Sequence, residues 1–283
     1  MTAVLFPGQG PQSAEMGEVV ERRRPELARA LERAVGPRPY ERLDATDAAQ
    51  PAVYCASLAG WSVIERSGVE PDVFAGHSLG EFAAAAAAEA VDAERALELV
   101  VARGRITAAA ASRNGAGGMV AVMGGTLDAV RPIAIGCGVV VANDNSPRQI
   151  VLSGRRDRLE KAAAKAIEQG FRAVPLNVAG AFHSPDMVDA AVRFQRELDR
   201  VPFRTPRRPV FSGITAQPFV DFRRQLADAL TEMVRWRELL LRLHRRGVRT
   251  FIDAGPGKVM AGLVKHTLSG VEIRTISDFG ADA

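Results

Sequence analysis

The chain has 283 residues, 47% of them hydrophobic and 25% charged, which is enough apolar material for one large domain or for one domain with a smaller insert. Its formal net charge is only +4, and its short basic runs lack interleaved aromatic residues, which argues against a nucleic-acid-binding protein. The absence of a basic and then apolar leader, and of any stretch of about 18 apolar residues, argues against a secreted or membrane-spanning protein.

The first part of the chain alternates short apolar runs with helical patterns. Residues 2–6 (TAVLF) are expected to form a buried strand that ends in the turn PGQG. A second short strand is expected at 72–75, and it ends at a glycine-rich corner. Four helical patterns accompany these strands, at residues 15–34, 51–67, 81–89 and 92–112. Pro51 is expected to open the second helix, because proline fits the first helical turn.

From about residue 118 the pattern changes to the order β-α-β-β-α-β, which is typical of a ferredoxin-like fold. The expected strands are GGMVAVMG, GVVVAND, RQIVLSG and RAVPLNV, and the expected helices are TLDAVRPIAI and RRDRLEKAAAKAIEQG. We therefore assign residues 123–186 to a small inserted subdomain, and residues 1–122 and 187–283 to a large domain.

The last part of the chain returns to alternating helices and strands. Helices are expected at 185–200 and 221–247, strands at 209–212 and 250–253, and GPGK opens a final helix. Strands that alternate with helices predict a parallel sheet covered by helices on both faces. The predicted fold class is therefore α/β.

The corner Gly76-His77-Ser78-Leu79-Gly80 lies between an apolar strand and an alanine-rich helix. This is the pattern of a nucleophile elbow, in which glycines avoid collisions between the strand and the helix. The serine oxygen then lies at the positive end of a helix, where amides can stabilise a developing oxyanion. A serine that only caps the helix in a glycine-rich turn would give the same five residues, so both interpretations stay open.

A serine nucleophile needs a general base, and the chain has four histidines. His77 adjoins the serine, and neighbouring side chains on a tight corner point apart. His244 and His266 fall in helical patterns, where an ordinary surface or core position accounts for them. Elimination leaves His183, on the loop GAFHSPDM, as the predicted base. No acidic residue stands out as a third member, so a backbone carbonyl could orient the imidazole.

Several motifs occur along the chain in a characteristic order. They are FPGQG at 6–10, QPAVYCASLAGW at 50–61, GHSLGEF at 76–82, VARGR at 101–105, ANDNSPRQIVLSG at 142–154, GAFHSPDM at 180–187, VRW at 234–236 and GPGKVMAGLVK at 255–265. As an ordered set covering nearly the whole chain, they resemble the malonyl-CoA:acyl carrier protein transacylases and the acyltransferase domains of fatty acid and polyketide synthases. The resemblance implies a large α/β-hydrolase-like parallel-sheet domain with the small ferredoxin-like insert.

In that family a serine attacks malonyl-CoA and holds the malonyl group as an ester until the phosphopantetheine thiol of a carrier protein takes it. The resemblance implies that Ser78 is the nucleophile and His183 the base. The backbone N–H groups of Gln9 and Leu79 would form the oxyanion hole. The coenzyme A thioester would be the substrate, with no bound cofactor and no metal, and an acyl carrier protein would be the partner.

The resemblance also assigns residues to the substrate. Arg103 would pair with the free malonyl carboxylate through its planar fork, although without the resemblance it would be one more helix arginine. Phe182, just before the histidine, would limit room for an α-methyl branch. Asn143 would contact the thioester or simply satisfy a turn. The main-chain carbonyl of Arg235, before the tryptophan of VRW, would orient the histidine.

The sequence therefore predicts a monomeric acyltransferase that moves malonyl from coenzyme A to a carrier protein. The alternatives are an acyl-thioester hydrolase of the same fold, a transferase for another acyl-CoA, and a non-catalytic scaffold that docks a carrier. Cys55 and Cys137 form no CxxC pattern and are expected as buried thiols, which fits a cytoplasmic protein. The sequence does not choose among fatty acid, polyketide and malonate decarboxylase pathways.

Overall fold

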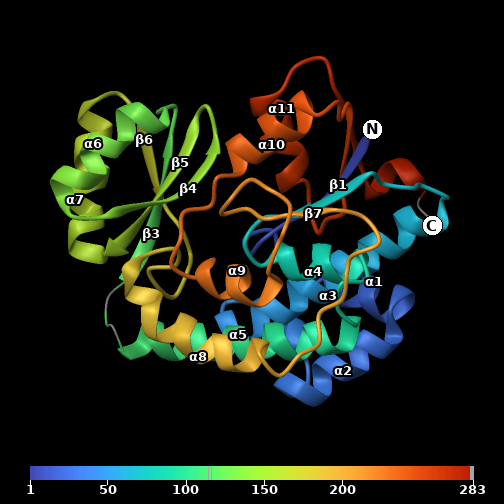
Figure 1. Ribbon diagram of the computed structural model, residues 1–283. Helices are drawn as coiled ribbons and strands as arrows, with labels where there is room; N and C mark the ends of the chain where they lie inside the picture. The colour runs from blue at the N-terminus through green and yellow to red at the C-terminus, as the bar shows by residue number, and fades with distance from the viewer. Residues whose placement is uncertain (114, 116, 281–283) are drawn as a thin grey trace.

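The computed structural model describes residues 1–113, 115 and 117–280, and it shows two domains, each built on its own sheet (Figure 1). The sheet of the large domain has five strands in the order β7-β2-β1-β8-β9, and all its neighbouring strands are parallel. The strands are β1 (Thr2–Phe6), β2 (Val73–Gly76), β7 (Val210–Phe211), β8 (Thr250–Asp253) and β9 (Glu272–Thr275).

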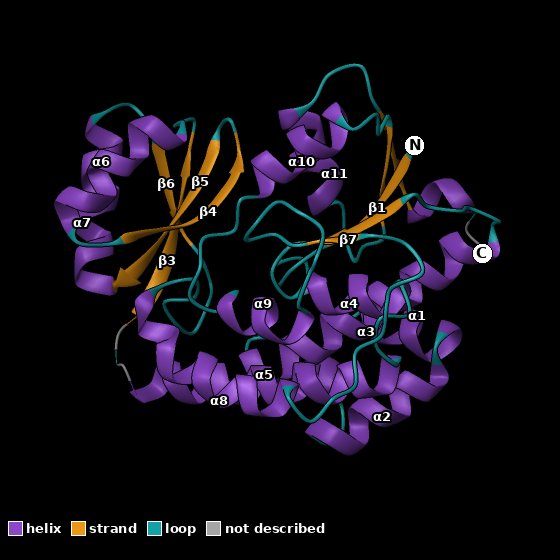
Figure 2. Ribbon diagram, in the orientation of Figure 1, coloured by secondary structure: helices purple, strands orange, loops and turns teal. Residues whose placement is uncertain are grey.

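Helices cover both faces of this sheet, as the alternation of buried residues in β1 requires. Val4 and Phe6 point into one apolar core, and Ala3 and Leu5 point into the other. The first core is built with α1 (Met16–Arg23), α2 (Pro25–Val35), α3 (Thr46–Arg66), α4 (Gly80–Ala87), α5 (Ala93–Arg113), α8 (Val188–Leu198) and α9 (Phe222–Asp228). The second core is built with α10 (Trp236–Arg245) and α11 (Val259–Thr267) (Figure 2).

Several predicted boundaries differ from the structure for identifiable reasons. The helix expected at 15–34 is two helices, because Arg24 is not helical and Pro25 starts α2. Pro51 lies inside α3, which begins at Thr46, rather than at its start. The sequence analysis missed β9, a short edge strand whose residues are partly exposed and so give no apolar run.

The helix expected at 221–247 is also interrupted, and the interruption matters for the site. Helix α9 ends at Asp228, α10 begins at Trp236, and residues 229–235 form an irregular segment between them. The first N–H groups of this segment still bond to carbonyls of α9, but Val234 bonds to the small domain instead: Val234 N donates to Ala142 O and Val234 O accepts from Asp144 N. We call residues 229–235 the connecting segment.

The small domain has a four-stranded antiparallel sheet in the order β4-β5-β3-β6. Its elements are β3 (Gly117–Met123), α6 (Leu127–Cys137), β4 (Val140–Ser146), β5 (Gln149–Arg155), α7 (Arg156–Glu168) and β6 (Arg172–Pro175). This order and pairing confirm the ferredoxin-like fold. Strand β3 pairs with β5 and β6 inside this sheet and begins at Gly117. The small domain therefore starts at Gly117, ahead of the boundary assigned at 123. Its last strand ends at Pro175.

The two faces of the small sheet have different neighbours. Val120 and Val122 of β3 pack under α6 and α7. Met119 and Ala121, which alternate with them, pack with Val178 and therefore face away from these two helices. The sheet thus offers one apolar face to the space between the domains.

Polar contacts also fix the small domain to the large one. Asp144 is almost fully buried, and its carboxylate accepts from Arg237 Nε at 3.0 Å while Arg237 Nη2 lies 2.9 Å from Oδ2. This two-atom contact adds to the two backbone hydrogen bonds at Val234. Across the part of the chain that the structure describes, no helix is both long and apolar enough to cross a membrane.

Candidate active site

The corner between β2 and α4 places Ser78 in the left-handed backbone region, with φ 52°. A Cβ atom on Gly76 would lie 2.0 Å from the carbonyl carbon of Gly80, and one on Gly80 would lie 2.3 Å from Phe6 O. Only glycine fits at either position, since no side-chain atom can come that close. The close packing of β1, β2 and α4 therefore holds Ser78 in a conformation that is unfavourable on its own.

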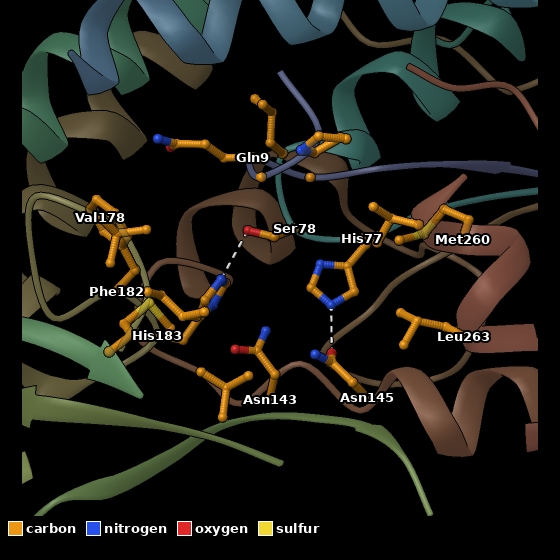
Figure 3. A pocket seen from close by; sticks show the side chains of 18 of the residues that line it. Gln9, His77, Ser78, Asn143, Asn145, Val178, Phe182, His183, Met260 and Leu263 are labelled. Carbon is orange, nitrogen blue, oxygen red and sulfur yellow. Dashed lines mark hydrogen bonds between the residues drawn. The ribbon is translucent and has the colours of Figure 1, made fainter. Parts of the chain in front are cut away.

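The side chains of Ser78 and His183 meet although they are 105 positions apart in sequence. Ser78 Oγ lies 2.8 Å from His183 Nε2, and His183 Nδ1 lies 3.1 Å from the carbonyl oxygen of Glu232 (Figure 3). A carbonyl can only accept, so Nδ1 carries the proton and Nε2 is left to accept from the serine hydroxyl. This is the tautomer that a general base for Ser78 needs.

The carbonyl that faces the imidazole is not the predicted one. The sequence analysis assigned it to Arg235, but Arg235 O accepts from Leu239 N as part of the first turn of α10. Arg235 N donates to Gly213 O at 2.7 Å. The connecting segment passes the histidine earlier along the chain, where Glu232 O is free of helical bonding. The prediction took Arg235 from the family resemblance, but in the structure the carbonyl of Arg235 is already used by the first turn of α10.

His183 is buried, and its backbone is fixed as firmly as its ring. Its φ is 56°, and its N–H donates to Leu230 O at 3.1 Å, so the connecting segment holds both the main chain and the imidazole. Burial, and then the charge of Arg103, lower the pKa of His183 to about 3. The imidazole is therefore neutral at ordinary pH, which is the form that can accept a proton.

Arg103 of α5 lies in the same buried cluster. Its Nη1 donates to Gln50 Oε1 at 2.7 Å, and its Nη2 donates to Ser78 Oγ at 3.2 Å. Gln50 Nε2 in turn reaches Thr107 Oγ1 at 3.4 Å, which holds the amide toward the arginine. Burial lowers the pKa of Arg103 to about 10, so the guanidinium stays charged at neutral pH. The sequence analysis did not single out Gln50, which looks like one polar residue in an apolar helix.

A buried carboxyl group that the sequence analysis also missed ties the two halves of the site together. Glu81 is 1% exposed, and its Oε1 accepts from Gly213 N at 2.6 Å. Gly213 O accepts from Arg235 N, and Arg235 belongs to the connecting segment that orients His183. Burial raises the pKa of Glu81 to about 8, although the Gly213 amide and the charge of Arg103 act against that rise. In sequence, Glu81 looks like an ordinary acidic residue in a first helical turn.

His77 points away from the reacting pair, as expected for a neighbour of the serine. Its Nε2 lies 2.8 Å from Asn145 Oδ1, and its ring packs edge-on against Trp236 (Figure 3). Burial lowers the pKa of His77. Asn143 is buried on the same wall, next to His183 in the view of Figure 3, and its backbone pairs with Val234.

Gln9 and Leu79, the residues predicted for an oxyanion hole, both line the cavity that contains Ser78. Leu79 directly follows the serine, and Figure 3 places Gln9 beside Ser78 at the edge of the cavity. In the described part of the chain, the N–H groups of Gln9 and Leu79 donate to no backbone or side-chain acceptor. Both amides are therefore available to a ligand oxygen.

One cavity of about 180 Å³ brings together residues of both domains. It is lined by seven of the eight predicted site residues: Gln9, Ser78, Leu79, Arg103, Asn143, Phe182 and His183. Arg235 is the exception. Met119 of the small sheet and Val178 add apolar wall beside Phe182. Within residues 1–113, 115 and 117–280, no three His, Cys, Asp or Glu side chains come together as metal ligands.

A hydroxyl bonded to a neutral imidazole, two free amides and a buried guanidinium form a site for acyl chemistry on an acidic substrate. In agreement, residues 4–277 match the family model of the acyl transferase domain, and the chain belongs to that family. It is 36% identical to the polyketide biosynthesis malonyl CoA-acyl carrier protein transacylase PksC of Bacillus subtilis, over 96% of this chain and 99% of that one. It is also 36% identical to a malonyl CoA-acyl carrier protein transacylase of the same species, over 98% of this chain and 93% of the relative.

Solved structures agree over the same length. The malonyl CoA-acyl carrier protein transacylase from Coxiella burnetii has a TM-score of 0.89 at 31% identity, covering 98% of this chain and 93% of that one. A type II polyketide malonyl-transacylase solved in complex with its acyl carrier protein has a TM-score of 0.88 at 30% identity, covering 97% of this chain and 95% of the matched chain. These matches confirm the α/β fold with its ferredoxin-like small domain.

Proposed function

We propose that this protein transfers a malonyl group from malonyl-CoA to the phosphopantetheine thiol of an acyl carrier protein, through an ester on Ser78. The main support is one contact: the buried guanidinium of Arg103 donates to the same Oγ that is bonded to the neutral His183. An acyl group attached to Ser78 would thus lie next to a fixed positive charge. The relatives named above as malonyl transacylases agree with this proposal.

In the first half-reaction, Ser78 Oγ attacks the thioester carbonyl carbon as its proton passes to His183 Nε2. The carbonyl oxygen becomes an oxyanion, which the amides of Gln9 and Leu79 would stabilise. The carbon–sulfur bond then breaks, and the proton on Nε2 passes to the departing coenzyme A sulfur. The products are the malonyl ester of Ser78 and free coenzyme A.

In the second half-reaction, the carrier thiol gives its proton to His183 Nε2 and its sulfur attacks the ester. The Ser78 oxygen leaves and recovers the proton, which restores the free enzyme and gives malonyl-carrier. The Glu232 carbonyl accepts from Nδ1–H throughout, so the imidazolium formed in each half is stabilised without a carboxylate.

Arg103 would select the acyl group. A guanidinium binds a carboxylate through two parallel hydrogen bonds, and Gln50 holds Nη1 while Nη2 points toward Ser78. The malonyl carboxylate would replace Ser78 Oγ as the acceptor of Nη2. All the proposed groups come from one chain, which supports an enzyme that acts as a monomer. Acyl transfer through a serine ester needs no bound cofactor. Its carrier would belong to fatty acid or polyketide synthesis.

Intact-mass measurement after exposure to malonyl-CoA tests this proposal. We expect a gain of one malonyl group, absent in Ser78→Ala, and loss of that group when a carrier protein with its phosphopantetheine arm is added. Acetyl-CoA offered in parallel tests the acyl selectivity. If malonate were released without a carrier as fast as it is transferred with one, the protein would be a hydrolase and the proposal would fail.

A further inference from the structure

Most arginines that line surface grooves of this protein are neutralised by an acidic neighbour. Three grooves away from the active site show this pattern. Their salt bridges are Arg207–Glu65, Arg208–Glu70, Arg95–Glu98, Arg200–Glu197 and Arg224–Asp228. Such exposed pairs contribute little to stability, but they neutralise the charged residues that line the first two grooves, and the third keeps the single arginine Arg196 outside any salt bridge of the described residues.

One groove differs, and we call it the basic groove. It has a volume of about 500 Å³, and its lining includes Arg148, Arg172, Lys258 and His266 but no aspartate or glutamate. In the residues that the structure describes, Arg148, Arg172 and Lys258 take part in no salt bridge. Several like charges facing one groove repel each other unless an anion joins them.

The basic groove is continuous with the catalytic cavity. Gln149, Val259 and Leu263 line both. They come from the start of β5 in the small domain and from α11 of the large domain, and Figure 3 shows Leu263 on the α11 side of the cavity. A long ligand with one end at Ser78 could therefore pass between the domains and place its other end among the cations.

Resting on the proposed function, we propose that the basic groove binds the phosphate groups of the coenzyme A donor. Coenzyme A has its thioester at one end and its phosphates at the other, joined by a pantetheine arm with amides and apolar carbons. The shared wall suits that arm, since Gln149 offers a side-chain amide and Val259 and Leu263 offer apolar surface. Arginine and lysine are the residues that bind phosphate oxygens best.

The test compares two donors with the same thioester and pantetheine arm: malonyl-CoA, and malonyl-pantetheine, which lacks the phosphates and the adenosine that they carry. The variant replaces Arg148, Arg172 and Lys258 together by glutamine, and Ser78 loading is followed by intact mass against donor concentration. We expect the half-saturating concentration of malonyl-CoA to rise about tenfold or more. The loading rate at saturation should stay unchanged, and so should loading from malonyl-pantetheine.

Arg95→Gln is the matched control, because Arg95 is an exposed arginine already paired with Glu98 in another groove. It should alter loading from neither donor. Unchanged malonyl-CoA loading in the triple variant, or equal losses with both donors, would overturn the proposal. So would normal loading followed by slow transfer to the carrier, which would assign the groove to the carrier instead. If the wild type loaded neither donor, the proposed function itself would fail.

Discussion

The two sides of the catalytic cavity are held in place by different kinds of interaction. On the nucleophile side, Ser78 is positioned by close packing of β2 and α4, with glycines where no side chain fits. On the base side, His183 is positioned by hydrogen bonds from the connecting segment, which contacts the small domain and Gly213. The first arrangement depends on residues 76–80 packed against the end of β1, and the second depends on hydrogen bonds from several parts of the chain far apart in sequence.

The largest expected effect on the transfer rate comes from variants that remove the reacting group on one side of the cavity and leave the other side intact. Ser78→Ala and His183→Ala should each slow transfer by about 10⁴-fold or more, because a nucleophile and its base act as one unit. The double variant should be little slower than either single variant. Steady-state rates with malonyl-CoA and a carrier measure this, and strictly multiplicative losses would contradict the coupling.

The next prediction tests the packing of the nucleophile side. Gly76→Ala should destabilise the protein by about 3 kcal/mol or more, because its Cβ would lie 2.0 Å from the Gly80 carbonyl carbon. The control is Gly262→Ala in α11, where no atom lies within 4 Å of the added Cβ. It should be neutral or stabilise by about 0.5–1 kcal/mol. Urea denaturation midpoints compare them, and equal midpoints would refute the packing argument.

Arg103 contacts Ser78 on the nucleophile side, but its proposed role is to bind the substrate carboxylate and not to position the serine. Arg103→Ala should reduce loading from malonyl-CoA by about 10- to 100-fold, the worth of a hydrogen bond to a charged group, and should spare acetyl-CoA. Arg105→Ala, an exposed arginine on the same helix, is the control and should affect neither donor. Equal losses with malonyl-CoA and acetyl-CoA in Arg103→Ala would show a structural role only.

Glu81 joins the two sides, and its variants should have a smaller effect. Glu81→Gln keeps an oxygen for Gly213 N and should transfer at nearly the wild-type rate. The side chain of Glu81→Asp is too short to keep that contact, so the connecting segment that orients His183 should shift. We expect kcat to fall about tenfold with KM unchanged. A loss as large in Glu81→Gln as in Glu81→Asp would show that the acid, and not the hydrogen bond, matters.

The pH dependence of stability gives a second measurement on the same residue. The pKa of Glu81 is raised from 4.5 to about 8 on folding, so its neutral form is favoured in the folded state. Its contribution is fully present below pH 4.5 and is lost as pH rises toward 8. As pH rises from 4.5 toward 8, the free energy of unfolding of the wild type should therefore fall relative to that of Glu81→Gln. A pH-independent difference would contradict the raised pKa.

Local pattern was enough for much of this molecule. The strand–glycine–serine–glycine–helix corner specifies the elbow because its constraints lie within one turn of chain, and the β-α-β-β-α-β order specifies the small domain because each element shows its own period. The histidine could be found by elimination, since four histidines left few choices. Arg103, Gln9 and Asn143 needed the family resemblance, because nothing local distinguishes them from surface or turn residues.

Only the tertiary structure decided which groups complete the site. Three contacts that the sequence analysis missed join segments far apart in sequence. The carbonyl of Glu232 accepts from His183, Gln50 accepts from Arg103, and Glu81 accepts from Gly213 N. A main-chain carbonyl has the same chemistry at every residue, so its role depends wholly on where an irregular segment runs. That path is set by packing between the two domains, which no short stretch of sequence encodes.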